Sequence, residues 1–343
     1  MPLPADSGSP AHPFRGAEIE VTGDLLRELH HNYVETYRGV ARSVPGGRVE
    51  YCGRSTLVRT GLKEAPFNPV FALERPGSVE TLPDQIHHLY EADEIPWMLV
   101  TTPSTAPALA LVIEELHLQR MLVLPGMVRP LPLEASPSLP RKLAVQYLKS
   151  SRELREAATH WPAEFGPIWE FFGGLLGTRE SYPGALQGVG VYLGLVEGKP
   201  AATALRVTTH GVAGIYMVFT LEAYRHRGVG TALTWRAAQD SVEEGGSVTY
   251  LQASAMGRPL YEKLGYRAIE DYQIWVTSKI LQDHEKAEQG RHDPLPSTAF
   301  HIPPSQSTTR CRIFVDGVIN QCVPIFAIRY LASLLTRSNS RTR

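Results

Sequence analysis

Apolar side chains along this chain change repeatedly between the spacing of a helix and that of a strand. Over Gly23–Ala41 they recur at roughly helical spacing, and short apolar runs further on are typical of buried strands. By these criteria the first half is expected to contain strands Ser55–Thr60, Pro69–Leu73, Trp97–Thr102, Met121–Leu124 and Gly126–Leu131, with further helices over Val79–Ala92 and Thr105–His117.

The second half follows residues 132–140, whose three prolines predict a linker. A hairpin is expected where Glu197-Gly198-Lys199-Pro200 joins two strand patterns, because glycine is favoured in such loops. The other expected elements are strand Lys142–Tyr147, helices Ser151–His160 and Pro167–Leu176, strand Gly214–Thr220, helix Val229–Glu244, strand Ser247–Ala253, helix Pro259–Leu264 and a last strand pair around Tyr266–Val276.

Composition and charge narrow the class of protein. The 343 residues suggest two domains, and 43% hydrophobic residues supply a sizeable core. Lys+Arg (34) and Asp+Glu (35) nearly cancel, which is a poor match for a nucleic-acid-binding protein. No uncharged apolar run reaches eighteen residues, so no membrane span is expected. Three cysteines without metal-type spacing and the lack of a secretory signal predict a cytoplasmic protein without a bound metal.

The segment that carries chemistry is Met217–Ala232, MVFTLEAYRHRGVGTA. A predicted strand leads into Arg225-His226-Arg227-Gly228-Val229-Gly230, and a helix is expected to begin at once. Glycines let backbone N–H groups approach a phosphate, and the helix start adds a positive partial charge. Arg225 and Arg227 add two cations. The pattern predicts a pyrophosphate-binding turn, and the alternative is an ordinary tight turn with surface arginines.

Other phosphate-binding motifs fit this segment poorly. A dinucleotide fingerprint requires a third glycine where Leu233 stands, and the Gly-Lys-Ser/Thr of a P-loop is absent. The spacing Arg-x-x-Gly-x-Gly resembles instead the coenzyme A motif of the GNAT (Gcn5-related N-acetyltransferase) superfamily. A second segment, Leu251–Tyr266, resembles the GNAT strand, short Tyr-bearing helix and Leu-Gly-Tyr that close the site. The resemblance covers about Lys142–Val276.

The resemblance implies an α+β GNAT fold, with a mixed, mostly antiparallel sheet flanked by helices, and acetyl-CoA as co-substrate. It also implies a role for each residue that matches the motifs. Ser254 would lie near the pantetheine or the thioester, and Tyr261 would protonate the departing thiolate. Ser254 could instead cap the next helix, and Tyr261 could be a core aromatic. The other implied coenzyme A contacts are Met217, Val218 and Phe219 for the pantetheine arm, and Arg225, His226, Arg227, Gly228, Val229, Gly230 and Thr231 for the pyrophosphate.

One expected part is missing. The predicted strand Gly214–Thr220 contains no Asp, Glu or His, although many GNAT members have a carboxylate base there. His210, Glu222, Glu170 or a water relay could replace it, and the sequence does not select among them. We therefore expect an acetyltransferase acting on a small amine, a peptide N-terminus or a lysine. A longer-chain acyltransferase and a non-catalytic acyl-CoA-binding regulator remain as alternatives.

The predicted organisation has five parts: a disordered lead-in (1–17), an N-terminal α/β domain (18–131), the linker (132–140), a catalytic GNAT domain (141–280) and a tail of unknown role (281–343). The first half ends with a predicted strand, helix and strand in the same order as the second half, but no Arg-x-x-Gly-x-Gly precedes residue 225. The first half is thus expected to be a degenerate GNAT-like domain that does not hold coenzyme A, or else an unrelated α+β domain. The sequence leaves the oligomeric state open.

Overall fold

A computed structural model of the chain describes residues 19–133, 136–161, 166–181, 186 and 188–282. The predicted lead-in at 1–17, and the predicted tail apart from its first two residues, lie outside the described residues.

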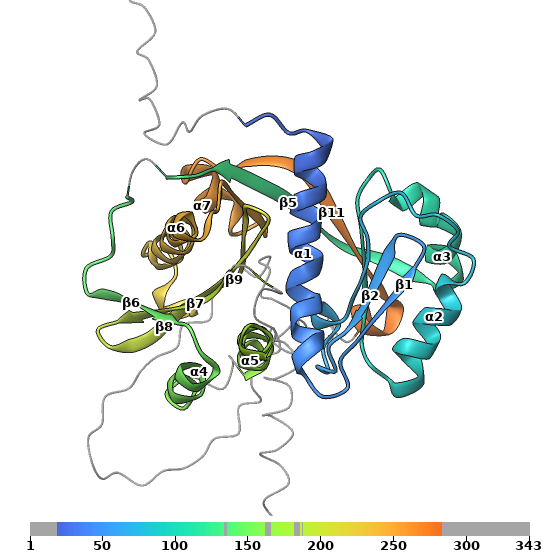
Figure 1. Ribbon diagram of the computed structural model, residues 1–343, viewed down its shortest axis with the longest axis horizontal. Coiled ribbons are helices and arrows are strands. Elements are labelled where there is room, and N and C mark those ends of the chain that lie inside the picture. The colour runs from blue at the N-terminus through green and yellow to red at the C-terminus, as the bar shows by residue number, and fades with distance from the viewer. Residues whose placement is uncertain (1–18, 134–135, 162–165, 182–185, 187, 283–343) are drawn as a thin grey trace, which may run out of the picture.

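One continuous mixed sheet runs through both halves of the described chain (Figure 1). Across the sheet its strands follow the order β1-β2-β3-β4-β11-β5-β10-β9-β8-β7-β6. Two neighbouring pairs, β3 with β4 and β9 with β10, are parallel, and the other described pairs are antiparallel. The strands are β1 (Arg48–Cys52), β2 (Ser55–Arg59), β3 (Pro69–Ala72), β4 (Met98–Thr101), β5 (Leu118–Pro130), β6 (Leu143–Leu148), β7 (Gly188–Val196), β8 (Lys199–Thr209), β9 (Val212–Thr220), β10 (Val248–Gln252) and β11 (Arg267–Thr277).

The helices cover both faces of this sheet. They are α1 (Gly23–Ser43), α2 (Leu82–Leu89), α3 (Ala110–Glu115), α4 (Ser151–Ala158), α5 (Gly166–Ser181), α6 (Val229–Asp240) and α7 (Arg258–Lys263). The largest core cluster joins α1, α4 and α5 to one face, where α1 crosses the centre of the sheet (Figure 1). On the other face, one cluster packs α2 and α3 and another packs α6 and α7. Because strand side chains alternate between faces, Tyr250 belongs to the α1 cluster and Leu251 to the α6 cluster.

The two halves repeat one order of elements and exchange their last strands. After α1 in the first half, and after β6, α4 and α5 in the second, each half has two antiparallel strands, then a strand, a helix and a parallel strand, and finally a short helix and a long strand. The last strand of the first half, β5, pairs with β10, and the last strand of the second half, β11, pairs with β4. β5 and β11 also pair with each other at the centre of the sheet. The halves therefore share one sheet.

The structure differs from the predicted elements in several places, and the helix predicted at Thr105–His117 is a 3-10 turn (Ala106–Leu109) followed by the shorter α3. Tyr266–Val276 forms one strand, β11, rather than a strand pair, because its partners are β4 and β5. The two strands predicted at Met121–Leu124 and Gly126–Leu131 are one strand, β5. β1 was not predicted, and its residues are partly exposed, so they lack a clear apolar pattern.

Candidate active site

The parallel strands β9 and β10 separate before β10 ends. Their pairs are Val212 with Val248, Ala213 with Thr249 and Gly214 with Tyr250, and none follows in the described sheet. β9 also bulges here: Met217 has φ 50°, and the register against β8 shifts around it. Because a bulge bends its strand, it directs β9 away from its neighbour. We call the segment beyond Gly214 and Tyr250 the β9–β10 divergence.

The corresponding strands of the first half do not separate. The β3–β4 ladder continues to Thr101, the last residue of β4, whereas the β9–β10 ladder stops two residues before Gln252, the last of β10. The short helices that follow differ too. Ala-Pro-Ala-Leu (106–109) precedes α3, and Arg-Pro-Leu-Tyr (258–261) begins α7, so Leu109 stands where the second half has Tyr261. The described first half thus lacks both the divergence and the tyrosine.

The glycine-rich turn lies just beyond the end of β9. Gly228 is the N-cap of α6 and has φ 76°, a conformation that favours glycine. The first hydrogen bond along α6 runs from the Ala232 N–H to the Gly228 carbonyl, at 3.0 Å. The N–H groups of Val229, Gly230 and Thr231 precede it and have no partner within the helix. Such a helix start suits an anion.

The two arginines of the turn have different environments. Arg225 is half-buried, and its Nε donates to the Thr220 carbonyl at 3.1 Å, so it ties the turn to β9. Arg227 is exposed, with its guanidinium 5.7 Å from the centre of the Tyr224 ring. Neither pairs with a carboxylate in the part of the chain that the structure describes.

A hollow of about 630 Å³ adjoins this turn. Glu197 at its edge pairs with Lys142, Nζ to Oε1, at 2.6 Å. Its charged lining residues are Arg141, Lys142, Lys199, Arg227 and Glu197. Cations outnumber anions, so the hollow suits a second anionic group beside the turn.

Ser254 and Tyr261 both lie beyond β10. The Ser254 hydroxyl accepts a hydrogen bond from the Gly257 N–H at 3.1 Å, so it stabilises the turn into α7. Tyr261 is buried, with its ring edge-on to Tyr266 at 5.9 Å, and burial raises the pKa of its phenol. No described residue hydrogen-bonds to the Tyr261 hydroxyl. Tyr261 packs in the cluster that contains Val229 and is bordered by Val218, on the α6 face of the sheet.

The candidate bases from the sequence lie apart from the divergence or on the surface. His210 is in the turn that precedes β9, at the opposite end of that strand, with Nδ1 2.9 Å from Glu28 Oε2. Glu222 is exposed just before the glycine turn, and Glu170 is exposed on α5. The structure adds a pair that sequence reasoning missed, His30 on α1 and Glu270 on β11, with Nε2 and Oε2 2.8 Å apart. No motif joins these two residues.

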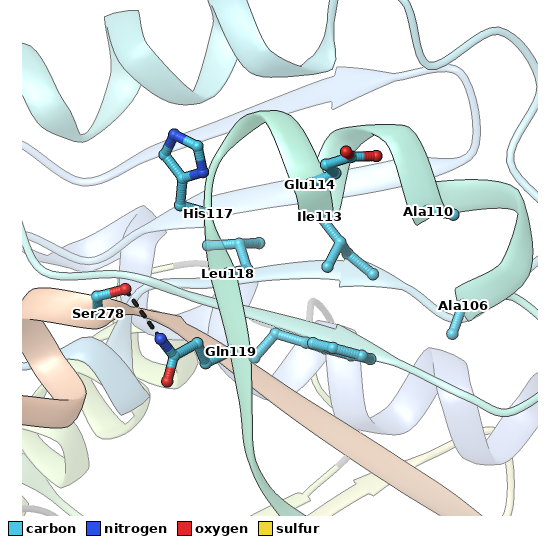
Figure 2. Close-up of a pocket in the computed structure, with 9 residues that line it drawn as sticks. Ala106, Ala110, Ile113, Glu114, His117, Leu118, Gln119 and Ser278 are labelled. Atoms are coloured by element: carbon cyan, nitrogen blue, oxygen red, sulfur yellow. Dashed lines mark hydrogen bonds between the residues drawn. The ribbon is translucent and has the colours of Figure 1, made fainter.

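A second hollow, of about 670 Å³, lies in the first half between α3, the start of β5 and the end of β11 (Figure 2). Ile113, Leu118 and Trp275 contribute apolar walls, and Gln119 Nε2 donates to Ser278 Oγ at 3.1 Å at one edge. It contains none of the residues that are predicted to bind coenzyme A.

Part of this sequence matches a known protein family, and the fold is similar to that of solved structures. Residues 148–266 match the sequence model of the family described as Acetyltransferase (GNAT) family. No curated protein matches the chain.

Three solved structures are similar to this chain, and the first of them has a similar fold. A GCN5-related N-acetyltransferase from Kribbella flavida is 19% identical, with 73% of this chain and 95% of that chain covered and a TM-score of 0.53. A GCN5-related N-acetyltransferase from Sphaerobacter thermophilus is 15% identical. The match covers 64% of this chain and 79% of that chain, with a TM-score of 0.45. A tandem GNAT protein from the clavulanic acid biosynthesis pathway is 12% identical. The match covers 73% of this chain and 94% of that chain, with a TM-score of 0.45.

The segment 148–266 is thus a GNAT domain, and the chain has the GNAT fold, which confirms the predicted resemblance and fold class. The described residues contain no group of three His, Cys, Asp or Glu side chains that could hold a metal ion. Among the described helices, none has the length and apolar character to cross a bilayer.

Proposed function

We propose that this chain is an acyl-CoA-dependent N-acyltransferase that transfers acetyl from acetyl-CoA to a primary amine. The observation that carries the proposal is the β9–β10 divergence, which leads directly to the glycine turn at the start of α6. An extended pantetheine arm can add to β9 as a further strand would, and a pyrophosphate can accept the N–H groups of the helix start.

We propose a role in this arrangement for each predicted contact. The backbone groups of Met217, Val218 and Phe219 are proposed to bind the pantetheine arm along the bulged part of β9. Arg225 and the N–H groups of residues 226–231 are proposed to bind the pyrophosphate. Ser254 is proposed to lie near the thioester, with its hydroxyl already engaged by Gly257.

The proposed reaction is direct transfer in a ternary complex. A neutral amine attacks the thioester carbonyl, backbone N–H groups stabilise the oxyanion, and the thiolate leaves with the Tyr261 proton. Because burial raises the pKa of Tyr261, the phenol stays protonated but is a weaker acid than in water. The same burial would raise the basicity of a thiolate formed beside it, which keeps the two groups matched.

A second candidate is a non-catalytic acyl-CoA-binding regulator, favoured by one observation. β9 runs Val-Ala-Gly-Ile-Tyr-Met-Val-Phe-Thr and bears no carboxylate or imidazole. A regulator would need the donor site but no base.

Thiol release separates the two candidates. Incubation of the full chain with acetyl-CoA and a mixture of small amines, peptides and lysine derivatives should release coenzyme A only when an acceptor is present. Binding of acetyl-CoA without acceptor-dependent release would favour the regulator. Replacing acetyl-CoA by longer acyl-CoA donors tests the chain length, for which acetyl is proposed. A cytoplasmic location is also proposed, from the absence of paired cysteine spacing.

A further inference from the structure

A buried histidine–glutamate pair joins the two halves beneath α1. His30 comes from α1 and Glu270 from β11, and their side chains are only 8% and 13% exposed. Burying a charged pair costs desolvation free energy, and the attraction between the two groups often does not exceed that cost. A gain in stability is therefore a weak explanation for the presence of this pair. Its position suggests another role.

Glu270 of the pair lies two strands away from the last residue of β10, across β5. Gln252, the last residue of β10, pairs with Gly126 of β5, and Gly126 pairs with Glu270. Residues paired directly across strands point to the same face of the sheet. Neighbouring strands are about 4.8 Å apart, so about 10 Å separate the backbones of Gln252 and Glu270. The rings of Tyr250 and Tyr272 lie over Gly126, between these two positions.

Polar side chains connect the divergence to the pair along this face. Gln252 Nε2 donates to the Tyr250 hydroxyl at 2.7 Å, and the Tyr250 ring lies 6.3 Å from that of Tyr272. Tyr272 in turn meets the His30 ring edge-on at 5.8 Å. Gly126 makes this possible, because a Cβ there would lie 2.6 Å from the Tyr272 ring and 3.4 Å from the Tyr250 ring.

Along this path the pair, and not the tyrosines, supplies the base. Burial raises the pKa of both Tyr250 and Tyr272, so their hydroxyls remain protonated. Glu270 orients the imidazole, because its carboxylate favours the tautomer with hydrogen on Nε2. The lone pair is then on Nδ1, which has no hydrogen-bond partner in the described part of the chain.

We propose that His30 is the general base of the acyl transfer and that Glu270 is its positioning residue; this inference rests on the proposed acyltransferase function. The amine nitrogen forms its bond to the acyl carbon and gives one proton to His30 Nδ1, directly or through one water. The carbon–sulfur bond breaks, and the thiolate takes one proton from Tyr261. His30 then releases its proton to water and Tyr261 regains one, so both residues return to their starting forms.

In this assignment the base, His30, and the acid, Tyr261, act from opposite faces of the sheet at the β9–β10 divergence. His30 is on the α1 face and Tyr261 on the α6 face. It also makes the first half a part of the active site, because the base comes from α1.

His30→Gln tests the base, and Glu270→Gln tests its positioning. His30→Gln should bind acetyl-CoA with unchanged affinity, while kcat for amine-dependent thiol release falls about 100- to 10,000-fold. The matched control is His210→Gln. It removes a similar pair, with Nδ1 and Oε2 of Glu28 2.9 Å apart, at an exposed position away from the divergence, and it should leave kcat unchanged.

A conservative variant separates positioning from a structural role. In Glu270→Gln, kcat for amine-dependent thiol release should fall while the Kd of acetyl-CoA and Tm stay unchanged, because no carboxylate then fixes the tautomer of the imidazole. Glu270→Asp keeps a carboxylate facing His30 Nε2 and should recover part of the lost kcat.

Three outcomes would overturn the assignment. One is a His30→Gln enzyme with kcat within about threefold of the wild type, since a general base contributes far more. Another is an unchanged kcat in Glu270→Gln, which also decides the matter if His30→Gln does not fold. The third is loss of acetyl-CoA binding in both variants, which would make the pair structural. Failure of the proposed function has a different signature, because the wild type itself would then release no thiol with any amine.

Discussion

Tyr261→Phe separates a catalytic phenol from a core aromatic. The ring packs against Tyr266 and lies close to Gly257, and phenylalanine keeps both contacts. Only the hydroxyl is lost, and no described residue hydrogen-bonds to it. Its removal breaks no hydrogen bond within the described chain, so the free energy of unfolding should change by less than about 1 kcal/mol. For a domain of this size, 1 kcal/mol corresponds to about 2–4 °C in Tm.

The effect on catalysis should be much larger than the effect on stability. Loss of a general acid lowers kcat about 100- to 10,000-fold, or about 3 to 5 kcal/mol in activation free energy, if thiolate departure limits the rate. Because burial raises the pKa of Tyr261, its own ionisation should not lower the wild-type rate below about pH 10. The assay is kcat for thiol release, measured beside Tm and the Kd of acetyl-CoA.

Tyr266→Phe is the matched control. Its hydroxyl lies 2.9 Å from Thr249 Oγ1, and both groups are buried. Its removal leaves Thr249 without that partner, so Tm should fall by several degrees, from about 1–3 kcal/mol, with little change in kcat. The reasoning is refuted if Tyr261→Phe keeps near-normal kcat while its Tm falls, because that pattern belongs to a core residue.

Three further predictions concern the donor site and the shared sheet. Gly228→Val should weaken acetyl-CoA binding more than tenfold. Its control is Gly245→Val, which introduces similar backbone strain (φ 80°) beyond the other end of α6 and should lower stability but not affinity. Equal affinities of the two variants for acetyl-CoA would contradict this prediction. Acetyl-CoA should bind about tenfold more tightly than its 3′-dephospho form, and Lys199→Ala should reduce that preference if the basic hollow holds the phosphate. Fragments 1–135 and 136–343, produced together, should co-purify because β5 pairs with β10 and β11, and separation without loss of fold would argue against a shared sheet.

The local parts of this fold and site could be predicted from the sequence. The turn at Arg225–Gly230 is signalled by glycines and arginines at fixed spacing, and α6 begins within this segment, at Val229. α7 has a proline in its first turn, at Pro259, and Gly265 follows with φ 82°. In each case the determining residues are neighbours in sequence, so short-range rules are sufficient.

The non-local parts could not be predicted in this way. β5 and β11 exchange places between halves, and no periodicity says which distant strand completes a sheet. The bulge at Met217 requires a positive φ, yet methionine gives no sign of it. The hydroxyl of Thr203 donates to the Met217 carbonyl at 3.0 Å, a support that depends on β8 as a neighbour. His30 and Glu270 are 240 residues apart and meet only because α1 crosses the exchanged strand.

A calorimetric titration of the full chain with acetyl-CoA tests the proposed donor site. One site per chain is expected, because the β9–β10 divergence and the glycine turn occur once in the described residues, while β3 and β4 stay paired to the end of β4. Binding at that site should be lost in Gly228→Val. Two equivalent sites per chain, or one site with unchanged affinity in Gly228→Val, would contradict this assignment of the donor site.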